Sequence, residues 1–72
     1  MNDYSFLEET NNGTLIFVKY LWYNEITLEY NKNKKEASKY VCDYRKKVEV
    51  DLDDDDYHFI SQFGSVLKKW TC

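Results

Sequence analysis

Hydrophobic and polar residues alternate along most of the chain, and the alternation gives way to a helical pattern near the end. Residues 25–30 are the clearest case, since Ile26, Leu28 and Tyr30 share one face and polar residues fall between them. Residues 14–23 are dense in β-branched and aromatic side chains, which favour strands. Residues 4–10 carry a weaker strand pattern. The pattern therefore predicts three strands before residue 31.

Short polar segments separate these strands. Asn12-Gly13 predicts a type I′ hairpin turn, because both residues tolerate a positive φ. Asn24-Glu25 predicts a second turn, which pairs Tyr23 with Ile26. The lysine-rich segment 31–36 predicts a loop.

Residues 38–52 allow more than one interpretation. Read as a strand, the segment places most of its apolar residues at even positions, including Tyr40, Cys42, Val48 and Val50, and these face the core. A helical stripe would last only two turns. Alternation explains more of the residues, so the segment predicts one long or kinked strand, or two short ones.

Residues 53–70 predict an amphipathic helix. Asp53 suits the N-cap, and Asp56, three residues on, completes a capping box. Lys68 and Lys69 suit the other end of the helix dipole. The apolar stripe spans an arc of about 120°, which is wide enough to face a core. Its residues are Phe59, Ile60, Phe63, Val66, Leu67 and Trp70.

Together these elements predict a single α+β domain, residues 1–72, with the order β-β-β-β-α. It is a small antiparallel sheet of three to four strands with one C-terminal helix packed on one face. One helix covers one face only. The other face of residues 14–23 then exposes Ile16, Val18, Tyr20 and Trp22. An exposed patch of this kind usually marks a partner surface or the interface of a homodimer. The alternative is that the first strand or the N-terminus folds over this face, or that the sheet curls.

Charge is segregated along the chain, whose net charge is −3. Six acids fall within residues 49–56, and acids clustered this way can imitate the phosphates of a nucleic acid and occupy a basic groove. Among them, Asp51, Asp54 and Asp55 are candidate partner contacts. The basic stretch 32–47 gives the alternative, a nucleic-acid surface in which bases interleave with tyrosines. Its candidate contacts are Lys32, Lys34, Lys35, Lys39, Arg45, Lys46 and Lys47.

The sequence predicts no catalytic set, metal site or cofactor. The one histidine, His58, falls on the polar side of the predicted helix, and the chain has no glycine-rich phosphate loop. Asp51, Asp53 and Asp55 have the spacing of a calcium loop, but Asp56 stands where that loop requires glycine. Two cysteines are too few for a disulfide scaffold. With no signal peptide and no membrane span, the expected location is the cytoplasm.

A short acidic chain rich in Asn, Lys and Tyr resembles, in composition, the small accessory proteins of phages and mobile elements of AT-rich bacteria. That resemblance implies inhibition of a host or defence enzyme. The leading hypothesis is therefore a non-enzymatic inhibitor that binds a nucleic-acid-handling protein. Its aromatic anchors would be Tyr20 and Trp22. The alternatives are direct nucleic-acid binding and a structural homodimer.

Overall fold

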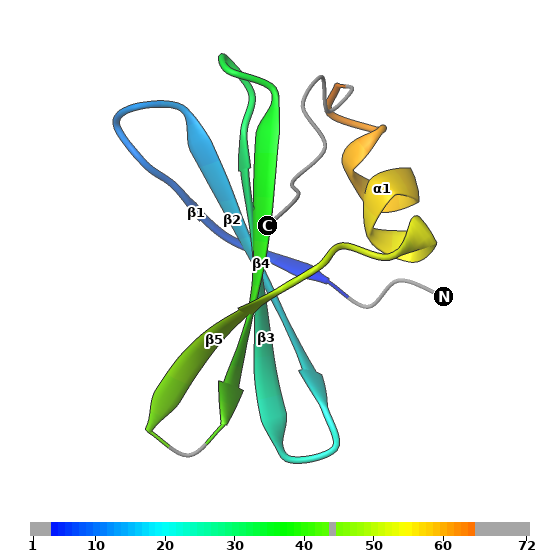
Figure 1. Cartoon of the computed structure of the whole chain (residues 1–72). Coiled ribbons are helices and arrows are strands. Elements are labelled where there is room, and N and C mark those ends of the chain that lie inside the picture. The colour runs from blue at the N-terminus through cyan, green and yellow to red at the C-terminus, as the bar shows by residue number, and fades with distance from the viewer. Residues whose placement is uncertain (1–3, 44, 65–72) are drawn as a thin grey trace.

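The computed structural model describes residues 4–43 and 45–64. These residues form a five-stranded antiparallel sheet and one helix on one of its faces (Figure 1), which confirms the α+β class with five strands instead of three to four. Neighbours along the chain are neighbours in the sheet, in the order β1-β2-β3-β4-β5. The elements are β1 (Ser5–Glu9), β2 (Thr14–Leu21), β3 (Asn24–Asn31), β4 (Glu36–Asp43), β5 (Lys46–Val50) and α1 (Asp54–Ile60).

The fifth strand arises because the ambiguous segment 38–52 folds back on itself. β4 and β5 pair antiparallel, with Val41 opposite Val48. Residues directly opposite each other share a face, so odd positions of β4 join even positions of β5. Val48 and Val50 thus lie on the helix side, as predicted, but Tyr40 and Cys42 do not. They lie on the opposite face, which corrects the assignment of all even positions to the core.

The turn between β2 and β3 lies two residues earlier than predicted. Leu21 pairs with Asn24, so the turn consists of Trp22 and Tyr23. This register sets Phe17 directly opposite Leu28, both buried, whereas a turn at Asn24-Glu25 would have set Phe17 opposite a lysine. Apolar pairing across the strands therefore outweighs the local preference of Asn for a turn.

The turn between β1 and β2 lies where predicted but has a different geometry. The N–H of Gly13 donates to the carbonyl of Thr10 at 3.1 Å, and the N–H of Thr10 donates to the carbonyl of Thr14 at 2.8 Å. Gly13 has a φ of 88°, while Asn12 is not among the described residues with positive φ. This arrangement is a type I turn followed by a left-handed glycine, a common three-residue hairpin connection, and not a type I′ turn.

The helix begins as predicted and ends much earlier. Asp53 is the N-cap, and its side chain and that of Asp56 form the predicted capping box. α1 ends at Ile60. The N–H of Phe63 then donates to the Ile60 carbonyl at 2.8 Å, and a bond between residues three apart is typical of a 3₁₀ turn, not of an α-helix. Gly64 follows with a φ of 142°, outside the helical region. The predicted helical residues 65–70 lie outside the described residues.

The core lies between α1 and the half of the sheet that α1 covers. Its buried members come from three strands and the helix: Phe17, Leu28, Tyr30, Ala37 and Ile60. Aromatic rings extend it, since Phe17 meets Phe59 edge to face with centroids 4.8 Å apart and also contacts Phe63 at 5.2 Å. Burial of these rings holds a short helix that would not be stable alone.

Candidate functional site

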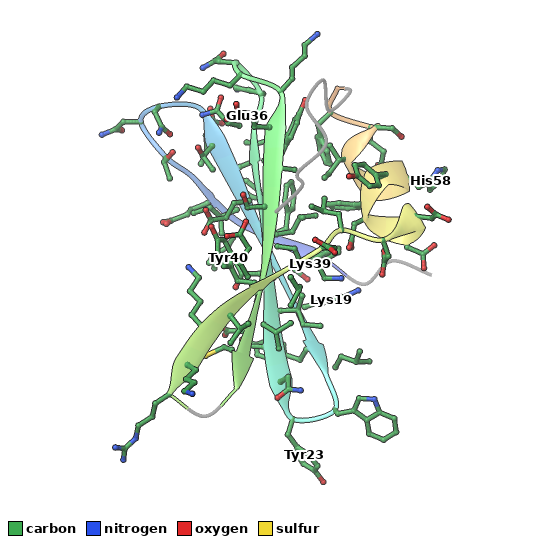
Figure 2. The ribbon with its side chains drawn as sticks, viewed as in Figure 1. Lys19, Tyr23, Glu36, Lys39, Tyr40 and His58 are labelled. Atoms are coloured by element: carbon green, nitrogen blue, oxygen red, sulfur yellow. The ribbon has the colours of Figure 1, made fainter. Side chains whose placement is uncertain are left out.

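Four consecutive residues at the β2–β3 turn form the largest run of exposed apolar surface in the described chain. Tyr20 is 72% exposed, Leu21 52%, Trp22 86%, and Tyr23 is fully exposed. We call residues 20–23 the aromatic tip. Figure 2 shows Tyr23 projecting beyond the end of the sheet, away from the helix. Large apolar side chains gathered in this way are unusual on a soluble domain and mark binding surfaces.

The backbone of the aromatic tip is strained. Trp22 has a φ of 60°, a left-handed conformation that glycine adopts readily and other residues rarely do. A positive φ at the first turn position is what a tight hairpin turn requires, and glycine or asparagine normally supplies it. A tryptophan there costs about 1–2 kcal/mol. The Trp22 side chain is largely exposed to solvent, so it contributes little packing.

The aromatic tip differs from the predicted patch on the strand. Trp22 sits in the turn and not on the face of β2, while Ile16 and Val18 are half-buried between β1 and β3. Tyr20 remains exposed, and its hydroxyl donates to the Glu25 carboxylate at 3.1 Å, which raises the pKa of Tyr20. Among the exposed aromatic side chains of the described residues, Tyr20, Trp22 and Tyr23 therefore lie together at one end of the sheet, whereas Phe6 and Phe63 are exposed elsewhere.

A buried charged network lies on the helix side, and the sequence pattern did not reveal it. Asp56 is fully buried and accepts from the Lys39 ammonium at 2.8 Å, the Tyr4 hydroxyl at 2.9 Å and the Asp53 N–H at 3.0 Å. Lys39 itself is only 8% exposed. Figure 2 shows Lys39 on the helix side of β4 and Tyr40 on the other side. The network joins the sheet, the helix and the segment before β1.

Burial and the bond to Asp56 raise the pKa of Tyr4, which keeps its hydroxyl neutral and donating. The N–H of Asp56 lowers the pKa of Asp53, which therefore remains an ionised cap. Two signals in the sequence could have found the network. Lys39 alternates with Ala37 and Val41, and Asp56 falls three residues before the partly buried Phe59 and four before the buried Ile60.

The candidate acidic contacts lie away from the aromatic tip. Asp51, Asp54 and Asp55 are exposed around the start of α1, on the helix side, whereas the tip is at the far end of the β2–β3 hairpin (Figure 1). Asp56, which completed the predicted acidic cluster, is buried and paired with Lys39. The structure thus divides the predicted partner surface into an aromatic part and a smaller acidic part.

The predicted basic surface is divided as well. Lys32, Lys34 and Lys35 lie in the β3–β4 loop, while Arg45, Lys46 and Lys47 lie at the other end of the sheet. The eight residues of β4 separate these groups by roughly 26 Å. Lys39, between them, is buried and paired with Asp56. The ammonium of Lys47 lies 4.4 Å from the Tyr40 ring centre. The seven bases do not form one continuous track for a nucleic acid.

Within the described residues, no group of three or more His, Cys, Asp or Glu could hold a metal ion, and His58 is exposed on the outer side of α1 (Figure 2). The described helix is too short to cross a membrane. Comparisons with protein-family models, curated proteins and solved structures find no match to this chain. The aromatic tip is therefore the strongest candidate site on structural grounds.

Proposed function

We propose that this chain is a non-enzymatic docking domain that inserts its aromatic tip into an apolar pocket of a partner protein. The observation that carries the proposal is the strained, 86% exposed Trp22 between the exposed Leu21 and Tyr23. A residue that costs folding energy and buries little surface in the free protein gains by burial in a complex.

The chemistry of the tip supports a protein partner. Trp and Tyr dominate the binding energy of protein interfaces, because each buries a large rigid area at a small entropic cost. The tip is convex, since it is the end of a hairpin, and therefore fits a pocket better than a flat surface. Arg45 and Lys46 lie on the neighbouring β4–β5 hairpin at the same end of the sheet. Acidic groups around the partner's pocket would complement them.

A narrower form of the proposal identifies the partner as a nucleic-acid-handling protein that the domain inhibits. The exposed acids at the start of α1 support it, because Asp51, Asp54 and Asp55 could meet a basic groove. In this form the partner contacts both the aromatic tip and the start of the helix. Asp53, the cap, would add its charge, since its side chain is 59% exposed.

The test is capture of proteins from cells that naturally make the chain, using tagged wild type and a tip variant, Trp22→Ser with Tyr23→Ser. The expected result is a protein that wild type retains and the tip variant loses. His58→Ser is the matched control, because it removes an exposed ring from α1 and should retain the partner. Equal retention by all three proteins, or retention of nucleic acid alone, would contradict the proposal.

The narrower form has its own variant, Asp54→Asn with Asp55→Asn. With the captured partner purified, the expected result is an affinity loss of about tenfold at low salt that shrinks at physiological salt. An affinity unchanged at both salt concentrations would restrict the contact to the aromatic tip.

A further inference from the structure

The two edge strands of the sheet differ in how they could meet another chain. β1 has a bulge between Phe6 and Glu8, a feature that opposes pairing with another strand. β5 pairs with β4 in an unbroken register from Lys46 to Val50 and is exposed over its first four residues. The β5 edge is therefore the one open to a further strand.

The free backbone groups of β5 belong to Lys47 and Glu49. Leu21 and Asn24 close a two-residue turn, so their backbones are hydrogen-bonded to each other. Bonded and non-bonded pairs alternate along antiparallel strands. When this alternation is followed from β2 through β3 and β4, Val48 and Val41 are a hydrogen-bonded pair. The backbone N–H and carbonyl groups of Lys47 and Glu49 then point away from β4. Both residues present an N–H and a carbonyl to the outside.

We infer that β5 pairs with β5 of a second copy of this chain, antiparallel and centred on Val48. In that register Lys47 of each copy stands opposite Glu49 of the other, twice by symmetry. Each such pair exchanges the outward N–H and carbonyl groups, and unlike charges directly opposite one another stabilise antiparallel strands. Within the described residues Glu49 makes no salt bridge, so it is available to a second copy. The Lys47 ammonium lies 3.6 Å from the Glu29 carboxylate of its own chain and would be shared between Glu29 and Glu49 of the second copy.

The same charges disfavour the neighbouring registers. Centring the pair on Lys47 would set that lysine against itself, and centring it on Glu49 would set two glutamates together. Registers between these would place Lys47 opposite Val48, whose side chain belongs to the other face of the sheet. The register centred on Val48 is the one that satisfies the backbone, the charges and the faces together.

The pairing also covers apolar surface. Val48 is 47% exposed on the helix side of the sheet and would meet Val48 of the second copy. The two-fold axis is perpendicular to the sheet, so both helices lie on the same side of a continuous ten-stranded sheet. The chain leaves β5 after Val50 and crosses toward α1 (Figure 1), which keeps the edge at residues 46–49 clear. The aromatic tip takes no part in this contact, so the inference is independent of the docking proposal.

Sedimentation equilibrium at low salt with a reducing agent, at concentrations up to about 1 mM, tests the dimer. Wild type is expected to dimerise as concentration rises. Glu49→Lys and Lys47→Glu each set like charges opposite one another and should weaken dimerisation about tenfold or more. An equimolar mixture of the two variants should dimerise again, because each then offers unlike charges to the other.

Two control variants complete the experiment, and circular dichroism checks that every variant is folded. Glu8→Lys, on β1, changes the net charge as Glu49→Lys does and should leave dimerisation unchanged. Trp22→Ser, in the aromatic tip, should also leave it unchanged. A wild type that stays monomeric throughout overturns the inference. So do single variants that dimerise like wild type, a mixture that stays monomeric, or a dimer lost in Trp22→Ser.

Discussion

The two ends of the sheet are built in opposite ways. At one end, which we call the closed end, the β1–β2 and β3–β4 loops are bonded to each other: the Asn31 amide donates to the Asn12 carbonyl at 3.3 Å, and the Lys32 N–H donates to the Gly13 carbonyl at 3.2 Å. α1 and the core lie over this half of the sheet (Figure 1). At the free end, the aromatic tip projects into solvent.

This difference separates stability from binding. Buried rings and satisfied hydrogen bonds at the closed end supply the folding free energy, which is only a few kcal/mol for a domain of this size. The free end contributes little packing and contains a strained tryptophan. We therefore expect substitutions at the closed end to unfold the protein and substitutions at the free end to leave it folded.

The largest expected effect is that of Asp56→Ala. It leaves the buried Lys39 ammonium with only its longer contact to Asp53, at 3.6 Å, and breaking a buried pair costs about 3–5 kcal/mol. Urea unfolding followed by circular dichroism should show a protein largely unfolded without denaturant. Adding Lys39→Met should recover part of the loss, because the buried charge is gone. Asp54→Ala, which removes an exposed acid in the same turn, is the control. If the stability losses of Asp56→Ala and Lys39→Met simply add in the double variant, the coupling between the two residues is contradicted.

A matched pair of leucines makes the comparison directly. Leu28 at the core is fully buried, and Leu28→Ala should cost about 3 kcal/mol through lost burial and a cavity. Leu21 in the aromatic tip is 52% exposed, and Leu21→Ala should cost less than about 1 kcal/mol. The free energies of unfolding from urea titrations measure both. Equal losses would mean that the free end is part of the folding core.

A smaller effect is expected for Tyr4→Phe, which removes one donor from Asp56 and should cost about 1.5 kcal/mol at neutral pH. Because folding raises the pKa of Tyr4, the stability due to its neutral hydroxyl is complete below the unfolded pKa, about 10, and is lost as the pH rises beyond it. The gap between wild type and variant should therefore narrow above pH 10. A gap that is constant from pH 7 to 11 would exclude a role for this ionisation.

The sequence predicts the elements of this fold better than their pairing. Alternation at Ile26, Leu28 and Tyr30 identifies β3, and Asp53 with Asp56 identifies the helix start. Periodicity fixes which residues share a face within a strand but not which partner each residue meets. The sequence pattern consequently predicts the β2–β3 turn two residues later than it lies in the structure. An even shift preserves the faces, so Phe17 still reached the core.

The candidate site was harder to predict, for the same reason. A turn at Asn24 makes Trp22 a strand residue on the open face, and the alternating pattern does not indicate the positive φ that Trp22 has. The apolar stripe predicts a helix that continues past Ile60, because such a stripe alone does not show where a helix ends. Gly64 packs against the Tyr30 hydroxyl, where an added Cβ would lie 2.6 Å from the oxygen. Such contacts exist only in three dimensions.

The smallest expected effect has the opposite sign, and it tests what the free end is for. Trp22→Gly removes the strain of a φ of 60° and should stabilise the domain by about 1 kcal/mol. Tyr23→Gly is the control, because Tyr23 is not among the described residues with positive φ and glycine there only adds chain entropy. Urea unfolding followed by circular dichroism measures both. A Trp22→Gly protein that is more stable yet loses its captured partner would show that the tryptophan serves binding at the expense of folding, whereas a less stable one would mean that its ring supports the turn.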